Sequence, residues 1–371
     1  MKKSLLAVAV AAALPAFAQA QSNVTLYGIA DVGVSWKDSG GTGAAGGTPG
    51  GTMAIDSGIQ STSRWGIRGE EDLGGGLKAI FNYEGGFKTD TGQSDAMQTL
   101  TPTSTTNPGG LFQRRAVAGV TGTFGQFLLG RDYTPGFSAL GTWDILGYGM
   151  WGNALNFSVA NVGNFTGSPV RWSNSLQWIS PNWSGFTLRG MYTAGENQTD
   201  SKSRGNGYGL SGVYAAGPLT IAAFYESQKA PGARSAPIAD GATVPKANSY
   251  GIGGQYNFGQ FRIGGGYAIQ DPDTSLKLQY WNIGGGMKLG PGEAMLQYSQ
   301  MKESLSDAKS DTWAIAYAYP VSRRTNLYVT LAQALNNDKS NYALLASDVA
   351  IGGGGLGKDP LGFSVGMRHQ F

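Results

Sequence analysis

The sequence predicts an all-β protein, a closed antiparallel barrel of sixteen strands that spans a membrane. Its composition favours strands and tight turns, with 60 Gly and 15 Phe, 9 Trp and 17 Tyr but only 14% charged residues. Apolar residues recur with a period of two along the chain, and short connectors alternate with long ones. A barrel satisfies all backbone hydrogen bonds inside a bilayer, and the signal of each of its strands is weak.

The N-terminal segment 1–20 has the pattern of a secretory signal peptide. Lys2 and Lys3 form its basic start, residues 5–17 are apolar, and Ala18-Gln19-Ala20 resembles a cleavage site. The apolar run is too short for a membrane-spanning helix. The sequence therefore predicts cleavage after Ala20 and a single barrel domain, residues 21–371, exported from the cytoplasm.

Composition excludes several classes of function. Without Lys2 and Lys3, 25 basic residues face 24 acidic ones, so no strong basic field supports a nucleic-acid partner. The chain has no Cys and one His, so no disulfide, metal centre, cofactor or catalytic residue is predicted, and the protein is not expected to be an enzyme.

Alternation defines the predicted strands. FRIGGGYAIQ (261–270) places Phe261, Ile263, Tyr267 and Ile269 on one face, with small or polar residues between them. TWAIAYAY (312–319) and VRWSNSLQW (170–178) follow the same pattern, the latter with Trp172 on the apolar face. A small or polar second face favours a water-filled lumen over a sandwich, whose inner face would be apolar.

The connectors give the strand count. Seven are tight and rich in turn residues: 72–76, 122–125, 181–185, 216–218, 258–260, 290–292 and 320–325. Eight are longer: 37–60, 89–110, 133–168, 196–206, 229–247, 271–275, 304–310 and 336–360. Together they separate sixteen strands. The last strand, 361–371, is expected to pair with the first, with His369 on its lipid-facing side in a structural role.

The connector 133–168 is unusual for an exposed loop. It contains several large aromatic residues and one charged residue, Asp144. A loop in free solution should be more polar. We therefore expect it to fold into the barrel and pack against the inner wall, the alternative being a large external cap over the pore.

Five stretches together resemble the general porins of Gram-negative outer membranes, specifically the β-proteobacterial, neisserial-like branch. They are VTLYGIADVGV (24–34), SRWGIRGEEDLGGGLKAIFNYEGGF (63–87), LFQRRAVAGVTGTFGQFLLGRDYTP (111–135), YPVSRRTNLY (319–328) and the terminal GMRHQF. The resemblance implies a homotrimer of sixteen-stranded barrels in the outer membrane, in contact with its lipid and lipopolysaccharide. It implies short periplasmic turns, an infolded third loop and passive passage of small hydrophilic solutes and ions. Phe371 resembles the family's signal to the barrel assembly machinery.

Alternation and resemblance together select candidate pore residues. With Trp65 and Ile67 facing lipid, Arg64, Arg68 and Glu70 face inward, and Arg171 faces inward opposite Trp172. The family pattern puts Arg114 inward and leaves Arg115 on the other face. The resemblance places the basic wall of a constriction at Arg64, Arg68, Arg114 and Arg171, across the lumen from the third loop. Glu84 and Asp144 are expected to be the acidic counterparts of this wall.

These charges predict an anion preference. Charges in a narrow, partly desolvated lumen are screened less than at an open surface. The shortage of acids on the third loop argues against a strong transverse field. Alternatively, the arginines pair with Glu70 or Glu84 and only hold the wall together. A solute-specific channel, a closed-barrel enzyme and a plugged adhesion barrel are the competing functions; small inner-face residues disfavour a plug.

Overall fold

The computed structural model describes residues 23–41, 51–94, 110–162, 165–166, 170–195, 205–229, 246–273, 276–352 and 354–371. The predicted signal peptide, residues 1–20, lies outside them. Among the described residues, no helix is sufficiently long and apolar to cross a membrane.

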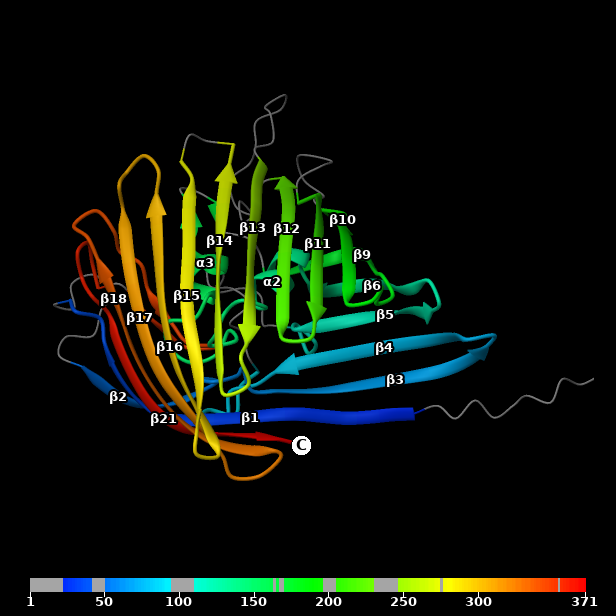
Figure 1. Cartoon of the computed structure of the whole chain (residues 1–371), viewed down its shortest axis with the longest axis horizontal. Coiled ribbons are helices and arrows are strands. Elements are labelled where there is room, and N and C mark those ends of the chain that lie inside the picture. The colour runs from blue at the N-terminus through cyan, green and yellow to red at the C-terminus, as the bar shows by residue number, and fades with distance from the viewer. Residues whose placement is uncertain are drawn as a thin grey trace, which may run out of the picture.

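Sixteen antiparallel strands form a closed barrel, as the alternation predicts (Figure 1). In chain order they are β1 (Asn23–Asp38), β3 (Arg64–Gly74), β4 (Leu77–Gly86), β5 (Arg115–Gly122), β6 (Gly125–Tyr133), β9 (Arg171–Ile179), β10 (Phe186–Thr193), β11 (Gly207–Ala216), β12 (Leu219–Lys229), β13 (Lys246–Asn257), β14 (Phe261–Pro272), β15 (Leu278–Leu289), β16 (Gly292–Glu303), β17 (Lys309–Pro320), β18 (Thr325–Asn336) and β21 (Leu361–Gln370). Each pairs with the next, and β21 closes the ring on β1 in a register that joins Ile29 to Gln370 and Asp38 to Leu361.

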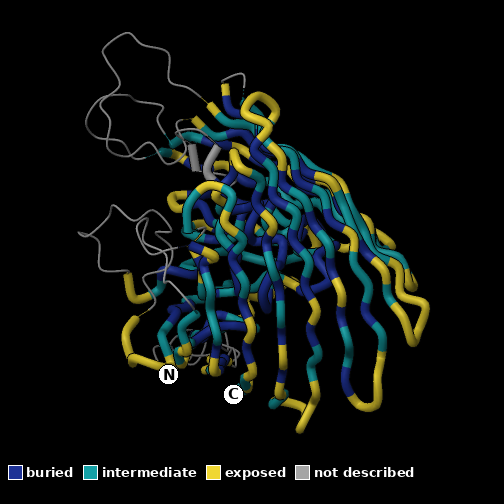
Figure 2. The backbone as a smooth tube through the Cα atoms, turned by 90° about the vertical axis from the view of Figure 1, so that its left-hand side faces the viewer, coloured by how far each residue is buried: buried dark blue, intermediate teal, exposed yellow. Residues whose placement is uncertain are grey.

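The wall has an apolar outer face and a small or polar inner face. On β14, Phe261 and Ile263 are 51% and 47% exposed on the outside, whereas Ala268 is fully buried on the inside. Figure 2 shows buried and exposed positions alternating along the strands. Apolar side chains on the outer face contact lipid, so their exposure there carries no free-energy cost. Every strand of the ring can therefore alternate between apolar outward and small or polar inward residues.

The third long connector folds into the barrel. It carries two short helices, α2 (Pro135–Leu140) and α3 (Leu155–Val159), and ends in the small hairpin of β7 (Asn161–Val162) and β8 (Phe165–Thr166). Figure 1 shows α2 and α3 within the curve of the sheet. Trp143 and Phe157 of this segment are at most 1% exposed and belong to one apolar cluster with wall residues of β12, β14, β15 and β16. We call residues 134–160 the inner loop.

Glycines on the inner wall make room for the inner loop. A Cβ added at Gly253 or Gly266 would lie 2.3 or 2.4 Å from the Trp143 indole, and one at Gly362 would lie 2.8 Å from the Trp151 indole. The Trp151 indole also donates a 2.8 Å hydrogen bond to the Ser364 hydroxyl on β21. Some of the small residues on the inner face therefore pack against the inner loop, and only the others line an open lumen.

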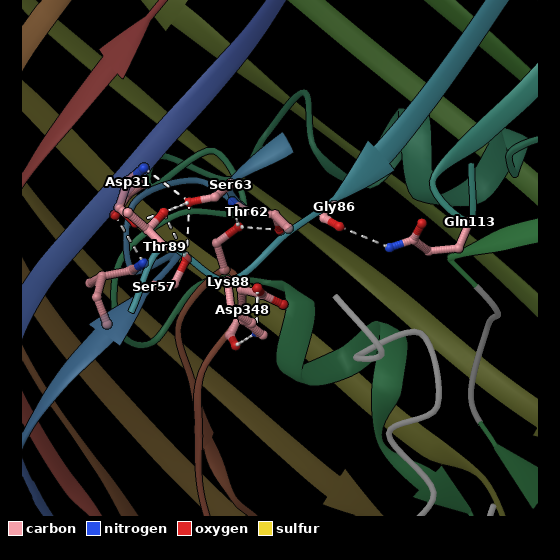
Figure 3. A network of polar contacts seen from close by, with 11 residues as sticks. Asp31, Ser57, Thr62, Ser63, Gly86, Lys88, Thr89, Gln113 and Asp348 are labelled. Atoms are coloured by element: carbon pink, nitrogen blue, oxygen red, sulfur yellow. Dashed lines mark hydrogen bonds and ion pairs between the residues drawn. The ribbon is translucent and has the colours of Figure 1, made fainter. Parts of the chain in front are cut away.

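Polar contacts join three other connectors near the external ends of the strands (Figure 3). Ser63 bonds to Ser57 at 3.0 Å and to Thr89 at 2.9 Å, which links the first connector to the second. The Lys88 ammonium lies 2.5 Å from the buried Asp348 carboxylate of the last connector. The first connector also contains β2 (Thr52–Ser57), which pairs with β1, and the last contains β19 (Leu344–Leu345) and β20 (Ala350–Ile351).

One strand departs from the predicted alternation. The register between β6 and β9 shifts next to Gly130 and Asp132, and Asn174 has a φ of 53°. This bulge turns Trp172 into the barrel, where it is 2% exposed and its indole donates to Gln228 on β12 at 3.3 Å. The expected lipid-facing position of Trp172 is therefore wrong, because a bulge re-aims the side chains around it.

The closing strand keeps the predicted pattern. Phe363, Val365 and Met367 are exposed on the outside, and His369 follows on the same face with Nδ1 2.8 Å from the Thr325 hydroxyl. The Phe371 amide and carbonyl exchange hydrogen bonds of 3.1 and 3.0 Å with Gly28 of β1.

Candidate functional site

A cluster of charges lines the lumen where the inner loop leaves the wall. Its members come from the external ends of neighbouring strands: Arg64 begins β3, Glu84 lies near the end of β4, Arg114 precedes β5, and Arg171 begins β9. The β-ladder aligns them, since Glu84 pairs with Gly66 of β3 and with Arg115 of β5. We call Arg64, Arg114 and Arg171 with Glu84 the arginine cluster.

Glu84 is the centre of the cluster. Its Oε1 lies 2.7 Å from Arg114 Nε, and its Oε2 lies 3.7 Å from Arg64 Nε. The Tyr27 hydroxyl of β1 donates to Oε2 at 3.1 Å. Glu84 thus lies within the basic wall and not on a facing acidic side, and it pairs with Arg114 and Arg64 as the structural alternative expected. The cause is that β4 pairs with β3 on one side and β5 on the other, and the register brings Glu84 level with the arginines of both.

Tyr133 connects Arg114 to Arg171. The Arg114 Nη2 group donates to the Tyr133 hydroxyl at 2.8 Å, and the Arg171 guanidinium carbon lies 4.1 Å from the centre of the Tyr133 ring. Such a cation–π contact orients the guanidinium without neutralising its charge. Among the described residues, the arrangement thus brings three guanidinium groups together with the Glu84 carboxylate.

Asp144 lies apart from these arginines, although the resemblance placed it in the constriction. It is 4% exposed, and its oxygens accept from the backbone amides of Tyr148 at 2.7 Å and Ala154 at 3.2 Å. Gln297 of β16 donates to it at 2.8 Å. Burial raises the pKa of Asp144 above its usual range, and these hydrogen bonds oppose the shift. Asp144 organises the inner loop and presents little surface to the pore.

Arg68 and Arg115 line a hollow closer to the tight turns of the barrel. The Arg68 guanidinium carbon lies 5.3 Å from the Tyr27 ring centre, and both arginines border the hollow together with Asn82. The expectation that Arg115 faces outward is wrong. Its Nη2 lies 3.0 Å from the inward, 1% exposed Asp132, because Arg115 is the first residue of β5 and shares its inner face with the buried Val117.

Two inward arginines that were not among the predicted site residues, Arg262 and Arg189, hold the inner loop. Arg262 of β14 donates to the Ile145 carbonyl at 2.9 Å and pairs with Glu293, and Arg189 of β10 donates to the Ser138 hydroxyl. Glu226 of β12 accepts from the Gly136 amide. Alternation does place Arg262 on the inner face, but it gives no indication of a loop partner.

The described residues contain no group of three His, Cys, Asp or Glu side chains able to hold a metal ion. What the site offers is a narrowed lumen with fixed positive charge.

Comparison with known proteins agrees with this geometry. The family described as Gram-negative porin matches residues 7–339. The chain is 33% identical to outer membrane porin protein 32 of Delftia acidovorans, over 100% of both chains. It is 28% identical to the major outer membrane protein P.IB of Neisseria gonorrhoeae over 56% of this chain and 52% of that one. The solved structure of an anion-selective porin from Comamonas acidovorans matches with a TM-score of 0.80 and 30% identity, over 95% of this chain and 100% of that chain. The chain therefore belongs to the Gram-negative porin family, and it is an outer-membrane channel protein and not an enzyme.

Proposed function

We propose that this porin is a general diffusion channel that prefers anions, and that the arginine cluster sets the preference. The observation that carries the proposal is the gathering of three arginines beside the inner loop, with Arg64 and Arg114 next to the Glu84 carboxylate and Arg171 over the Tyr133 ring. The similar porin from Comamonas acidovorans is anion-selective, which supports the same preference here.

The proposed filter acts through positive charge on one wall and does not require a negatively charged wall on the other side of the lumen. Glu84 is part of the basic wall, and Asp144 is buried within the inner loop with its oxygens occupied. An anion passing the cluster meets attraction that a narrow, partly desolvated lumen screens less than bulk water does. Small hydrophilic solutes then pass by diffusion, with anions enriched at the constriction.

Reversal of one charge tests the filter. Arg64 is the suitable position, because its side chain is 26% exposed and lies farther from Glu84 than Arg114 does. For Arg64→Glu, a local change of two charges should lower the anion-to-cation permeability ratio on the order of tenfold. The ratio is read from the reversal potential of single channels in a KCl gradient.

Arg323→Glu is the matched control, since Arg323 lies exposed in the turn between β17 and β18, away from the cluster. It should leave the reversal potential unchanged. Equal shifts in both variants would show that the total charge of the protein, and not the cluster, controls selectivity.

We further propose that the barrel forms a homotrimer in contact with outer-membrane lipid and lipopolysaccharide, and that Phe371 directs it to the barrel assembly machinery. In support, Phe371 is 46% exposed beyond the last strand and pairs with Gly28 through its backbone. Deletion of Phe371 should reduce the amount of barrel in the outer membrane while leaving refolding of the purified chain intact. Normal amounts in the membrane would refute this role.

A further inference from the structure

Three aromatic rings extend from the arginine cluster onto the inner loop. Tyr133 stacks on Phe137 with ring centres 5.1 Å apart, and Phe137 stacks on Tyr148 at 4.2 Å, both pairs within 7° of parallel. The Arg171 guanidinium also lies over the Tyr133 ring. We call Tyr133, Phe137 and Tyr148 the aromatic stack.

The stack lies on the lumen side of the inner loop. Pro135, Gly136, Ala139 and Leu140 of α2 are buried against the wall, whereas Phe137 on the same helix is only half-buried. Tyr133 and Tyr148 are half-buried as well. The Tyr148 hydroxyl donates to the Phe137 carbonyl at 2.7 Å, which fixes the third ring to the helix. Three partly exposed rings therefore form a fixed row that begins at the arginine cluster with Tyr133 and continues onto the inner loop with Phe137 and Tyr148.

This juxtaposition matches one class of solute. A carboxylate pairs with guanidinium groups through charge-assisted hydrogen bonds. An aromatic ring gains from edge-to-face or offset contact with other rings, which a saturated ring of the same size cannot make. We propose that the constriction is a subsite for aromatic carboxylates, in which the arginine cluster holds the acid group and the aromatic stack contacts the ring. The proposal rests on the anion-preferring function proposed above.

Benzoate and cyclohexanecarboxylate are the probes, because they share the charge, the acid group and a six-membered ring. The experiment measures the concentration of each that halves the chloride current of single channels. Benzoate should block at a concentration about 2- to 10-fold lower, the fold-change that corresponds to one aromatic contact. Simple hydrophobic contact predicts the opposite order, since the saturated ring is the more apolar.

Variants assign the preference to the stack. Phe137→Leu removes the central ring and should bring the two blocking concentrations together, whereas Tyr148→Phe keeps all three rings and should retain the difference. Tyr148→Leu replaces Phe137→Leu if the latter gives no channels. Equal block of the wild type by both probes overturns the proposal, and so does a preference that survives the loss of a ring.

The chloride-to-potassium permeability ratio of the same channels separates this inference from the proposed function. Chloride preference without discrimination between the probes refutes the aromatic subsite alone. Potassium preference refutes the anion-selective function on which the subsite rests.

Discussion

Arg64 and Arg114 both lie next to the Glu84 carboxylate, but they differ in burial and in their distance from it. The Arg114 side chain is 4% exposed and lies 2.7 Å from Glu84, whereas that of Arg64 is 26% exposed and lies 3.7 Å away. A close, buried pair satisfies two desolvated charges, and a longer, more exposed one contributes little to stability. Arg114 therefore holds the wall together, and Arg64 supplies charge to the lumen. We therefore expect the structural and selective roles to fall to different arginines.

This division predicts a difference in stability. Arg114→Gln leaves the Glu84 carboxylate without its close partner and should lower the free energy of unfolding by about 3–5 kcal/mol. Arg64→Gln should cost about 1 kcal/mol or less. Denaturant unfolding of the two purified variants measures both values, and equal small losses would mean that the Arg114–Glu84 pair does not hold the wall.

Asp144 predicts a specific dependence on pH. Burial raises its pKa in the folded protein above the value of about 3.9 in an unfolded chain. The folded state thus binds the proton more tightly, and this group makes the free energy of unfolding fall as pH rises between the two pKa values. Asp144→Asn should remove that component from unfolding curves recorded across acidic pH. An unchanged slope in the variant would contradict the assignment.

Sequence alone predicted the inward face of Arg64 and Arg68 and offered Glu84 as one possible partner of the arginines, but it could not choose between that pairing and a separate acidic side. The inward positions of Arg64 and Arg68 follow from Trp65 and Ile67, which alternate with them. The place of Glu84 among the arginines depends on the register between strands, which side-chain period does not encode. The same limit applies to Asp144, because its partners are backbone amides of a loop whose path no periodicity describes.

At the scale of elements, the inner loop and the glycines beneath it form one packed unit. Trp143 is fully buried above Gly253 and Gly266, and Ile145 contacts the positions of Gly264 and Gly284. Large side chains on the loop thus meet positions without side chains on the wall. The size of the constriction depends on this fit, since the same loop carries Phe137 and Tyr148.

A double-mutant cycle tests the fit. Gly266→Ala places a methyl group 2.4 Å from the Trp143 indole and should cost about 1–3 kcal/mol of unfolding free energy. Trp143→Ala should cost about 3–5 kcal/mol. In the double variant the methyl group occupies vacated space, so its cost should nearly vanish, with a coupling of at least about 1 kcal/mol. Additive losses would indicate that the two positions do not share a packed contact.

The sequence predicted that this segment folds inward, but the expectation that the inner-face glycines only line an open lumen was incomplete. Its aromatic residues and scarcity of charge indicated burial, and the structure confirms it. A glycine on the inner face, however, is compatible with open bore and with close packing of a loop. The bulge in β9 could not be predicted from the sequence either. It depends on the left-handed backbone conformation of Asn174, and the pattern of apolar residues does not indicate that conformation.

For the whole molecule, strand number and order were predictable because lipid and water impose opposite demands on the two faces of every strand. The tight and long connectors predicted from turn residues separate the sixteen strands of the ring, and β21 pairs with β1 as expected. The short strand β2, which extends the ladder of β1 inside a long connector, adds pairing that alternation did not predict.

The closed ring of strands forms the channel, the inner loop narrows it, and the proposed filter is the arginine cluster on the wall beside that loop. The most direct test is the reversal potential of wild-type channels in a planar bilayer under a KCl gradient. The arginine cluster predicts discrete conductance steps with a reversal potential that favours chloride. A reversal potential that favours potassium would contradict the account.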